Sequence, residues 1–464
     1  MRITAVLALA ALTACAQTPD SGYRAEVSMN RLVEQPGSSV TSAVNLFSGQ
    51  TPQRVSRSNA EIAQDFLDLE FRMESGRALP VLTRFEGGPI TVALTGQVPP
   101  TAEADLARLI SRFRNEAGLD VRRASGPANI NVVFVPRKTI RATFSNVACF
   151  VAPRVASWEE YKAARGTGTL DWTTLRQRER LAIFAPADST PQEVRDCLHE
   201  EIAQAMGPLN DLYQLPDSVF NDDNFHTVLT SFDMLMLRVH YAPELRSGMT
   251  REQVAAVLPG LLARLNPTGA TGRTHQGGQT PRAWIRAMET ALGPRGSVSA
   301  RNAAAHEALA IAHAQGWQAS RLAFSWFAVG RLNVSNDPVA AANAFANAQR
   351  IYRRLPGAQI QAAHVDMQLA ALALSQANPA QAIAFADRAI PVARQAQNAS
   401  LLATVMLVKA QALEAQGNVA AARALRLDSQ GWARYGFGSD AATRARMRDI
   451  ASLVPSKLRQ LFRG

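Results

Sequence analysis

Three Ala-rich segments near the C-terminus recur at almost equal intervals, and this recurrence constrains the fold more than any other feature. The segments are DPVAAANAFANA (337–348), NPAQAIAFADRA (378–389) and GNVAAARALR (417–426), which begin 41 and 39 residues apart. When the segments are aligned, Ala341, Ala382 and Ala421 coincide. Because small residues at fixed places let paired helices pack closely, residues 299–464 are predicted to form an all-α domain of helical-hairpin repeats.

This pattern resembles tetratricopeptide repeats, although its interval is longer than the ~34 residues of that family. The resemblance implies a peptide or protein partner that binds on the helical repeats. An Ala-rich helical bundle that only packs on the rest of the chain is the alternative. Residues 268–298 begin with a Gly/Thr-rich stretch and are predicted to be a linker with a short helix around Trp284.

The N-terminus has the pattern of a bacterial lipoprotein signal. Met1-Arg2 is followed by the apolar run 3–13 and by Leu-Thr-Ala-Cys ending at Cys15. Residues 1–15 are therefore predicted to be a signal peptide with a lipobox, and Cys15 to carry the lipid. Cleavage as an ordinary signal peptide just after Cys15 is the alternative. Resemblance to Gram-negative lipoproteins implies the periplasmic side of the outer membrane, because Ala16 is not Asp.

The two other cysteines support export. Cys149 and Cys197 form an even pair once Cys15 is assigned to the lipid, and an oxidising compartment favours a disulfide between them. Two separately buried thiols are the alternative. The 42 residues that follow the lipobox, 16–57, are rich in Ser, Thr, Gln and Pro and are predicted to be a flexible tether.

Composition favours a globular protein with more than one core. The chain has 464 residues, of which 47% are hydrophobic, and a formal net charge of +11. Its Arg residues are scattered and no basic run alternates with aromatic residues, so no nucleic-acid partner is predicted. Such a charge attracts a lipid-tethered protein to anionic headgroups.

Residues 58–267 carry the signals of an α+β domain, with a mixed sheet and packed helices. Alternating or continuous apolar residues predict strands over 89–96, 129–136 and 180–186. Helices are predicted around Phe66 and over the apolar series that begins at Leu106. A further helix begins at TPQE (190–193), where a capping Thr, a Pro and a Glu follow in the order of a helix start.

This last helix is predicted to have two different faces. Val194, Leu198, Ile202 and Met206 form an apolar stripe at i+4 spacing. Cys197, Glu200, Glu201 and Gln204 lie on another face, which is predicted to be a polar cluster. Gly207 is predicted to end the helix in a left-handed conformation.

The helix and the residues after it resemble the zinc motif of metzincin peptidases, the matrixins most of all. Glu200, Gln204 and Asn210 stand in the three ligand places and Glu201 in the general-base place, with Asp211 after the last ligand. The resemblance continues in DSVF (217–220), which is similar to the turn beneath the metal, and in the helix-like run with Asp233 and Tyr241. The zinc motif can also be aligned so that it begins at His199-Glu200. This second alignment puts Ala203 in a ligand place, so it is less favoured.

The chain also resembles the domain of unknown function 2927 family of proteobacterial lipoproteins. The segments that carry the likeness lie in 58–90, 197–222 and 248–267. This resemblance implies no activity, so function has to be inferred from the site.

The ligand places of this sequence suit zinc poorly. Zinc prefers imidazole and thiolate, whereas amide oxygens bind it weakly. No cofactor and no metal are therefore predicted, and weak calcium binding is the alternative. His226 and His240 would change this prediction if they approached Glu200 and Gln204. The sequence predicts a membrane-anchored periplasmic binding or scaffold module with a degenerate peptidase-like domain. An atypical peptidase or cell-wall hydrolase with Glu201 as general base is the alternative.

Overall fold

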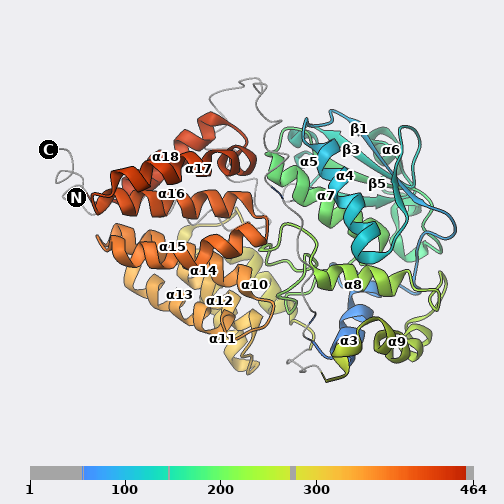
Figure 1. The fold of residues 1–464 in the computed structure, drawn as a ribbon. Helices are drawn as coiled ribbons and strands as arrows, with labels where there is room; N and C mark the ends of the chain where they lie inside the picture. Colours follow the sequence, from blue (N-terminus) through green and yellow to red (C-terminus); the bar gives the residue numbers. More distant parts are fainter. Residues whose placement is uncertain (1–46, 48–54, 56, 145–146, 272–277, 456–464) are drawn as a thin grey trace. The chain divides into compact units, whose positions relative to one another are not determined.

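The computed structural model describes residues 47, 55, 57–144, 147–271 and 278–455 (Figure 1). The predicted signal peptide, with Cys15, and most of the predicted tether lie outside the described residues. The chain divides into two compact units. The first comprises Gln50–Asp222 and Thr227–Gly277, and the second comprises Met1–Gly49, Asp223–His226 and Gly278–Gly464.

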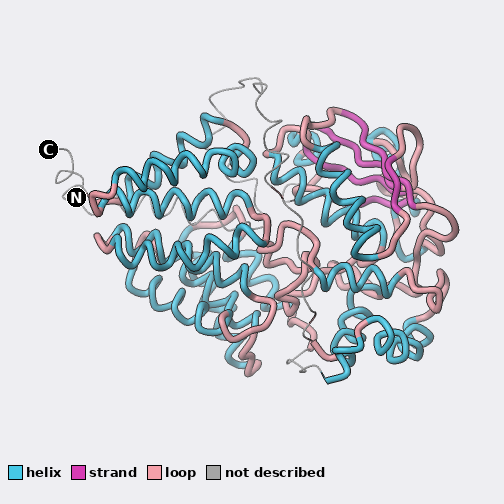
Figure 2. The backbone as a smooth tube through the Cα atoms, in the orientation of Figure 1, coloured by secondary structure: helices cyan, strands magenta, loops and turns pink. Residues whose placement is uncertain are grey.

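The first unit contains a mixed five-stranded sheet, as predicted. Its strands are β1 (Ile90–Gly96), β2 (Val121–Arg123), β3 (Ile130–Val135), β4 (Phe150–Pro153) and β5 (Leu181–Pro186). Their spatial order is β2-β1-β3-β5-β4, in which β4 is antiparallel to β5 and the other pairs are parallel. Figure 2 shows these strands as one layer.

Helices cover both faces of this sheet. The helices of the first unit are α3 (Asn59–Glu70), α4 (Ala102–Arg112), α5 (Arg137–Arg141), α6 (Trp158–Ala164), α7 (Pro191–Met206), α8 (Ser231–His240) and α9 (Arg251–Leu265). The side chains of β5 alternate between two cores, so Ile183 packs with the apolar residues of α4 and α7, whereas Phe184 packs with Trp158 and Tyr161 of α6. Burial on both faces explains why β3 and β5 are almost continuously apolar.

The three predicted strands are confirmed as β1, β3 and β5. The strands β2 and β4 were not predicted from the sequence. β2 is three residues long, with only Val121 buried, and β4 is a four-residue edge strand. Strands this short carry too few residues for a periodic pattern.

The second unit consists of helical hairpins, which confirms the predicted fold class. Its helices are α10 (Arg282–Leu292), α11 (Val298–Ala314), α12 (Ser320–Asn333), α13 (Pro338–Tyr352), α14 (Gln359–Ser375), α15 (Pro379–Gln395), α16 (Ala399–Ala415), α17 (Val419–Phe437) and α18 (Asp440–Leu453). Consecutive helices pack as the pairs α10 with α11, α12 with α13, α14 with α15 and α16 with α17 (Figure 1). The short helix predicted around Trp284 is α10.

The structure corrects the alignment of the third Ala-rich segment. α13, α15 and α17 begin after the capping residues Asp337, Asn378 and Asn418. Four residues after each cap lies a fully buried alanine: Ala341, Ala382 and Ala422. The prediction that Ala421 occupies this place was wrong by one residue, because the helix is capped by Asn418 and not by Gly417.

A short segment distant in sequence completes the core of the helical unit. Residues 223–226 belong to this unit, and the fully buried Phe225 has its ring centroid 5.2 Å from that of Phe327 and 4.8 Å from that of His364. Nothing in the local sequence indicated this placement, because one aromatic residue in a polar loop carries no periodicity.

Candidate functional site

The start of α7 has the predicted capping box. The Thr190 hydroxyl accepts from the Glu193 backbone N–H at 3.2 Å, and the Glu193 carboxylate accepts from the Thr190 N–H at 2.9 Å. The apolar stripe of α7 is buried throughout, with Val194, Leu198, Ile202 and Met206 each at most 1% exposed. Both predictions for the scaffold of this helix are confirmed.

The polar face of α7 is buried as well. Glu201 is 5% exposed and Gln204 is 8% exposed, whereas Glu200 is half-buried. The expectation that the helix packs by one side and presents its polar cluster on the other was wrong. Residues from elsewhere in the chain, among them Asp211 and Asp222, lie close enough to this face to interact electrostatically with Glu200.

Glu200, Glu201 and Asp211 form a group of interacting carboxyls, which we call the α7 carboxyl cluster. Burial, together with Glu74 and Asp222, raises the pKa of Glu200 to about 8. Burial and the neighbouring Glu200 raise the pKa of Glu201 well above its usual range. Burial and the carboxyls of Glu74 and Asp222 do the same to Asp211. The cluster therefore holds protons at neutral pH that isolated carboxyls would release.

Two oxygens of the cluster, Oε2 of Glu201 and Oδ1 of Asp211, are buried without a hydrogen bond among the described residues. Since a buried carboxylate without donors is strongly unfavourable, this environment favours the neutral acid. A neutral carboxylic acid cannot accept a proton, so the arrangement is unfavourable for a general base at Glu201.

Of the three places that resemble metal-ligand positions, Asn210 binds another segment of the chain. The Asn210 side-chain amide donates to the backbone carbonyl of Asp68 at 2.9 Å, and this bond holds the loop after α7 against α3. Among the described residues, no group of three or more His, Cys, Asp and Glu side chains is arranged to hold a metal ion. Glu200, Gln204 and Asn210 are thus parts of the packed structure around α7.

The C-terminal end of α7 is held by a residue that the sequence analysis did not single out. Arg178 is 2% exposed, and its guanidinium donates to the backbone carbonyls of Gln204, at 2.7 Å, and of Gly207. It also donates to the Thr83 hydroxyl at 3.2 Å. The last carbonyls of a helix lack partners within the helix, so Arg178 satisfies groups that would otherwise be buried and unpaired.

Gly207 ends α7, but not in the predicted conformation. Its φ of −148° is outside the left-handed region. A Cβ atom at Gly207 would lie 3.3 Å from Oε1 of Glu70 and 3.5 Å from the His240 ring. The residue therefore allows the chain to pack closely against the buried, hydrogen-bonded side chains of Glu70 and His240, and this packing explains the glycine better than backbone freedom.

None of the three histidines considered in the sequence joins the carboxyl cluster. His240 is fully buried, and its Nδ1 lies 2.8 Å from the Glu70 carboxylate. His226 belongs to the helical unit, where burial, Arg331 and His226 together lower the pKa of His364 to about 3. His199 is buried, and its Nδ1 accepts from the Leu229 backbone N–H at 3.2 Å. Burial and nearby arginines hold the pKa of His199 well below its usual range.

The turn at 217–220 is fixed by α8. Asp233 caps the start of α8 with Thr230, and its carboxylate also accepts from the Ser218 hydroxyl and from the Val219 backbone N–H at 3.2 Å. Burial raises the pKa of Asp233 to about 6, although these donors oppose the shift. Asp233 therefore has a structural role, in the place where the peptidase resemblance put it.

Cys149 and Cys197 are bonded to each other in the structure, with their Cα atoms 6.1 Å apart. Cys149 directly precedes β4, and Cys197 lies in the second turn of α7. The bridge thus connects the helix that carries the cluster to the edge of the sheet.

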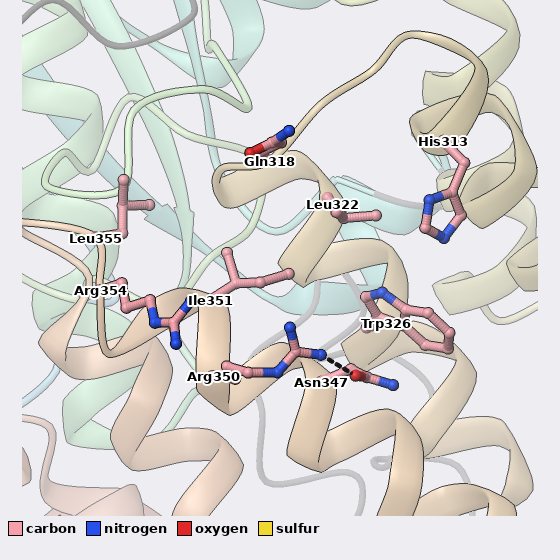
Figure 3. Close-up of a pocket in the computed structure, with 9 residues that line it drawn as sticks. All are labelled: His313, Gln318, Leu322, Trp326, Asn347, Arg350, Ile351, Arg354 and Leu355. Atoms are coloured by element: carbon pink, nitrogen blue, oxygen red, sulfur yellow. Dashed lines mark hydrogen bonds between the residues drawn. The ribbon is translucent and has the colours of Figure 1, made fainter.

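The helical unit contains a pocket of about 410 Å³ (Figure 3). Its lining comes from the end of α11, from α12 and from the last turns of α13: His313, Gln318, Leu322, Trp326, Asn347, Arg350, Ile351, Arg354 and Leu355. Apolar, aromatic and cationic side chains therefore meet there, without an acidic one. A partner that binds the helical repeats was predicted from the sequence, but no residue was predicted to contact it.

The model of the family described as Protein of unknown function (DUF2927) matches residues 59–260. We call residues 59–260, over which the chain is similar to this family, the DUF2927 domain. The family resemblance drawn from the sequence is confirmed, and the DUF2927 domain contains the sheet and α7 with its carboxyl cluster. No curated protein and no solved structure matched the chain. The likenesses to metzincins and to tetratricopeptide repeats stay predictions.

Proposed function

We propose that this protein is a lipid-anchored binding or scaffold module on the periplasmic side of the outer membrane. In this proposal Cys15 carries the lipid, the DUF2927 domain is a rigid body without peptidase chemistry, and the helical hairpins bind a peptide or protein partner. No helix in the described residues is long and apolar enough to cross a bilayer.

One observation carries the choice of binding over catalysis. The side chains in the places that resemble a peptidase site are committed to the packed structure, since Asn210 is bonded to the Asp68 carbonyl and Glu201 is buried in an environment that favours its neutral form. The pocket on the helical unit, in contrast, is lined by apolar side chains and by Arg350 and Arg354, which form no ion pair among the described residues. Its volume falls within the range of ligand sites.

The anchor is tested by membrane fractionation. Wild type and Cys15→Ser are expressed in the same Gram-negative host, and each membrane fraction is analysed by mass spectrometry for the full chain and for a lipid-modified Cys15. We expect a lipidated wild type in the outer membrane and a Cys15→Ser protein that is released. A Cys15→Ser protein as membrane-bound as wild type would contradict the anchor.

A hydrolase that uses Glu201 is the second candidate. The observation in its favour is that burial raises the pKa of the neighbouring Glu200 to about 8, because a carboxyl that titrates near neutral pH is suited to act as a general acid. Peptide and cell-wall fragments incubated with wild type and with Glu201→Gln at pH 6 and pH 8 test this function. Cleavage by wild type that Glu201→Gln lacks would favour the hydrolase over the binding module.

A further inference from the structure

We propose that the pocket formed by α11, α12 and α13 binds an acidic peptide segment in which carboxylates flank an aromatic or branched aliphatic side chain. This inference rests on the proposed binding function and names the chemistry of its partner. Three features of the pocket support it: the apolar walls, the two cations, and the absence of an acidic residue from the lining.

The walls of the pocket are suited to an apolar side chain. Trp326 of α12 is half-buried, and its ring meets that of His313 edge to face, with the centroids 5.9 Å apart. Figure 3 shows these two rings on one side of the pocket and Ile351 with Leu355 on the other. An aromatic or branched side chain placed between them would remove apolar surface from water on both sides.

Two arginines at the pocket are available for carboxylates. Arg350 and Arg354 are exposed and one helical turn apart, so they lie on the same side of α13 and its C-terminal turn. Arg350 donates to the uncharged amide of Asn347 (Figure 3). Within the ranges that the structure describes, neither guanidinium forms an ion pair. A carboxylate can accept two parallel hydrogen bonds from such a group.

The nearest arginine along the chain behaves differently. Arg353 forms an ion pair with Asp366 at 3.4 Å, and Asp366 is also paired with Arg388 at 2.7 Å. Asp366 thus pairs with an arginine that does not line the pocket, whereas Arg350 and Arg354, which do line it, form no ion pair among the described residues. The difference indicates that the charge at the pocket is complementary to a group outside the chain.

A peptide fits these groups better than a nucleic acid does. Leu322, Ile351 and Leu355 provide branched aliphatic contacts, whereas single-stranded nucleic acids are bound mainly on aromatic platforms along a continuous basic groove. Stacks of helical hairpins commonly bind extended peptides. The guanidiniums of Arg350 and Arg354 are one helical turn apart. This spacing suits a peptide in which one apolar side chain enters the pocket and a carboxylate lies on each side of it.

The test begins with an unbiased selection of peptides on the full chain, purified in detergent. A random peptide library is displayed and selected against wild type at low salt. We expect enriched peptides in which Asp or Glu flanks Phe, Trp, Leu or Ile. Enrichment of peptides without acidic residues would overturn the pocket assignment while leaving the binding function in place. Failure to enrich any peptide would overturn both.

Affinities of one enriched peptide then assign the site. Its fluorescein conjugate is titrated with wild type, Trp326→Ala and the double variant Arg350→Gln/Arg354→Gln, and the Kd is measured by anisotropy. We expect at least a tenfold weaker Kd for each variant and a weaker wild-type Kd at higher salt. The matched control is Arg423→Gln, which removes one exposed arginine of α17 away from the pocket and should leave the Kd unchanged.

The same measurements separate the proposal from a purely structural role of the arginines. Cations near the C-terminal end of a helix stabilise it, so the melting temperature of each variant is measured beside its Kd. A Kd that weakens at an unchanged melting temperature supports the proposal. Equal affinity of wild type and the double variant would overturn it, as would tighter binding of a single-stranded oligonucleotide than of the acidic peptide.

Discussion

Arg178→Leu removes the buried guanidinium that holds the end of α7, and its effect can be worked out from the structure. Two backbone carbonyls, those of Gln204 and Gly207, would lose a charged donor. A hydrogen bond to a charged group contributes about 1.5–3 kcal/mol. Relief from burying a charge offsets part of this loss, because burial already lowers the pKa of Arg178. We expect the free energy of unfolding of the first unit to fall by about 3–5 kcal/mol.

A matched control lies two residues further along the chain. The Arg180 side chain is 50% exposed and forms an ion pair with Glu160 at 3.0 Å. Exposed ion pairs of this kind contribute at most about 1 kcal/mol. Arg180→Leu therefore makes the same chemical change in the same segment, but removes no contact with the end of α7.

Thermal unfolding of both variants, followed by far-UV circular dichroism, measures the difference. In a unit of this size, 1 kcal/mol shifts the melting temperature by about 2–4 °C. The transition of the first unit should fall by roughly 10 °C in Arg178→Leu and by no more than ~4 °C in Arg180→Leu. Equal shifts in the two variants would refute the role assigned to Arg178.

Three further predictions concern the surroundings of α7. Because the pKa of Glu200 is raised from 4.5 to about 8, the folded state keeps a proton that the unfolded state loses, and stability should fall as the pH rises through this window. Glu200→Gln should abolish part of that fall in chemical denaturation series at pH 4.5, 6 and 8, and an unaltered pH profile would contradict it. Thiol counting on unfolded, unreduced protein should find neither Cys149 nor Cys197 free, and Cys149→Ser should cost up to ~4 kcal/mol in urea unfolding. Gly207→Ala should lower the melting temperature by an amount equivalent to about 1–3 kcal/mol, since its Cβ would press on the Glu70 carboxylate; an unchanged transition would show that the site relaxes freely.

The fold class could be predicted because its main elements are long and strongly patterned. β3 and β5 are buried on both faces, and the start of α7 has a capping box that depends only on local residues. Local patterns say which residues share a face, but not what covers that face. Glu201 was therefore predicted to lie in a polar cluster on a face other than the apolar stripe, whereas it is buried, with Glu200 and Glu74 close enough to interact with it electrostatically.

Other parts of the site had no local signal at all. Arg178 lies just before β5, among the neighbouring arginines Arg176 and Arg180, and nothing in the sequence distinguishes the one that is buried. The pocket is formed at three helices, of which only α13 carries one of the three recurring segments. Long-range packing determines both features, so only the structure could identify them.

The central claim is that α7 preserves the geometry of a site without its chemistry, and Glu201→Gln tests it most directly. Gln has nearly the size and shape of a neutral glutamic acid but cannot exchange a proton. The variant is introduced into a deletion strain, and complementation is measured beside the melting temperature of the purified protein. We predict full complementation at an unchanged melting temperature at neutral pH. Loss of complementation at an unchanged melting temperature would contradict the claim and assign chemistry to Glu201.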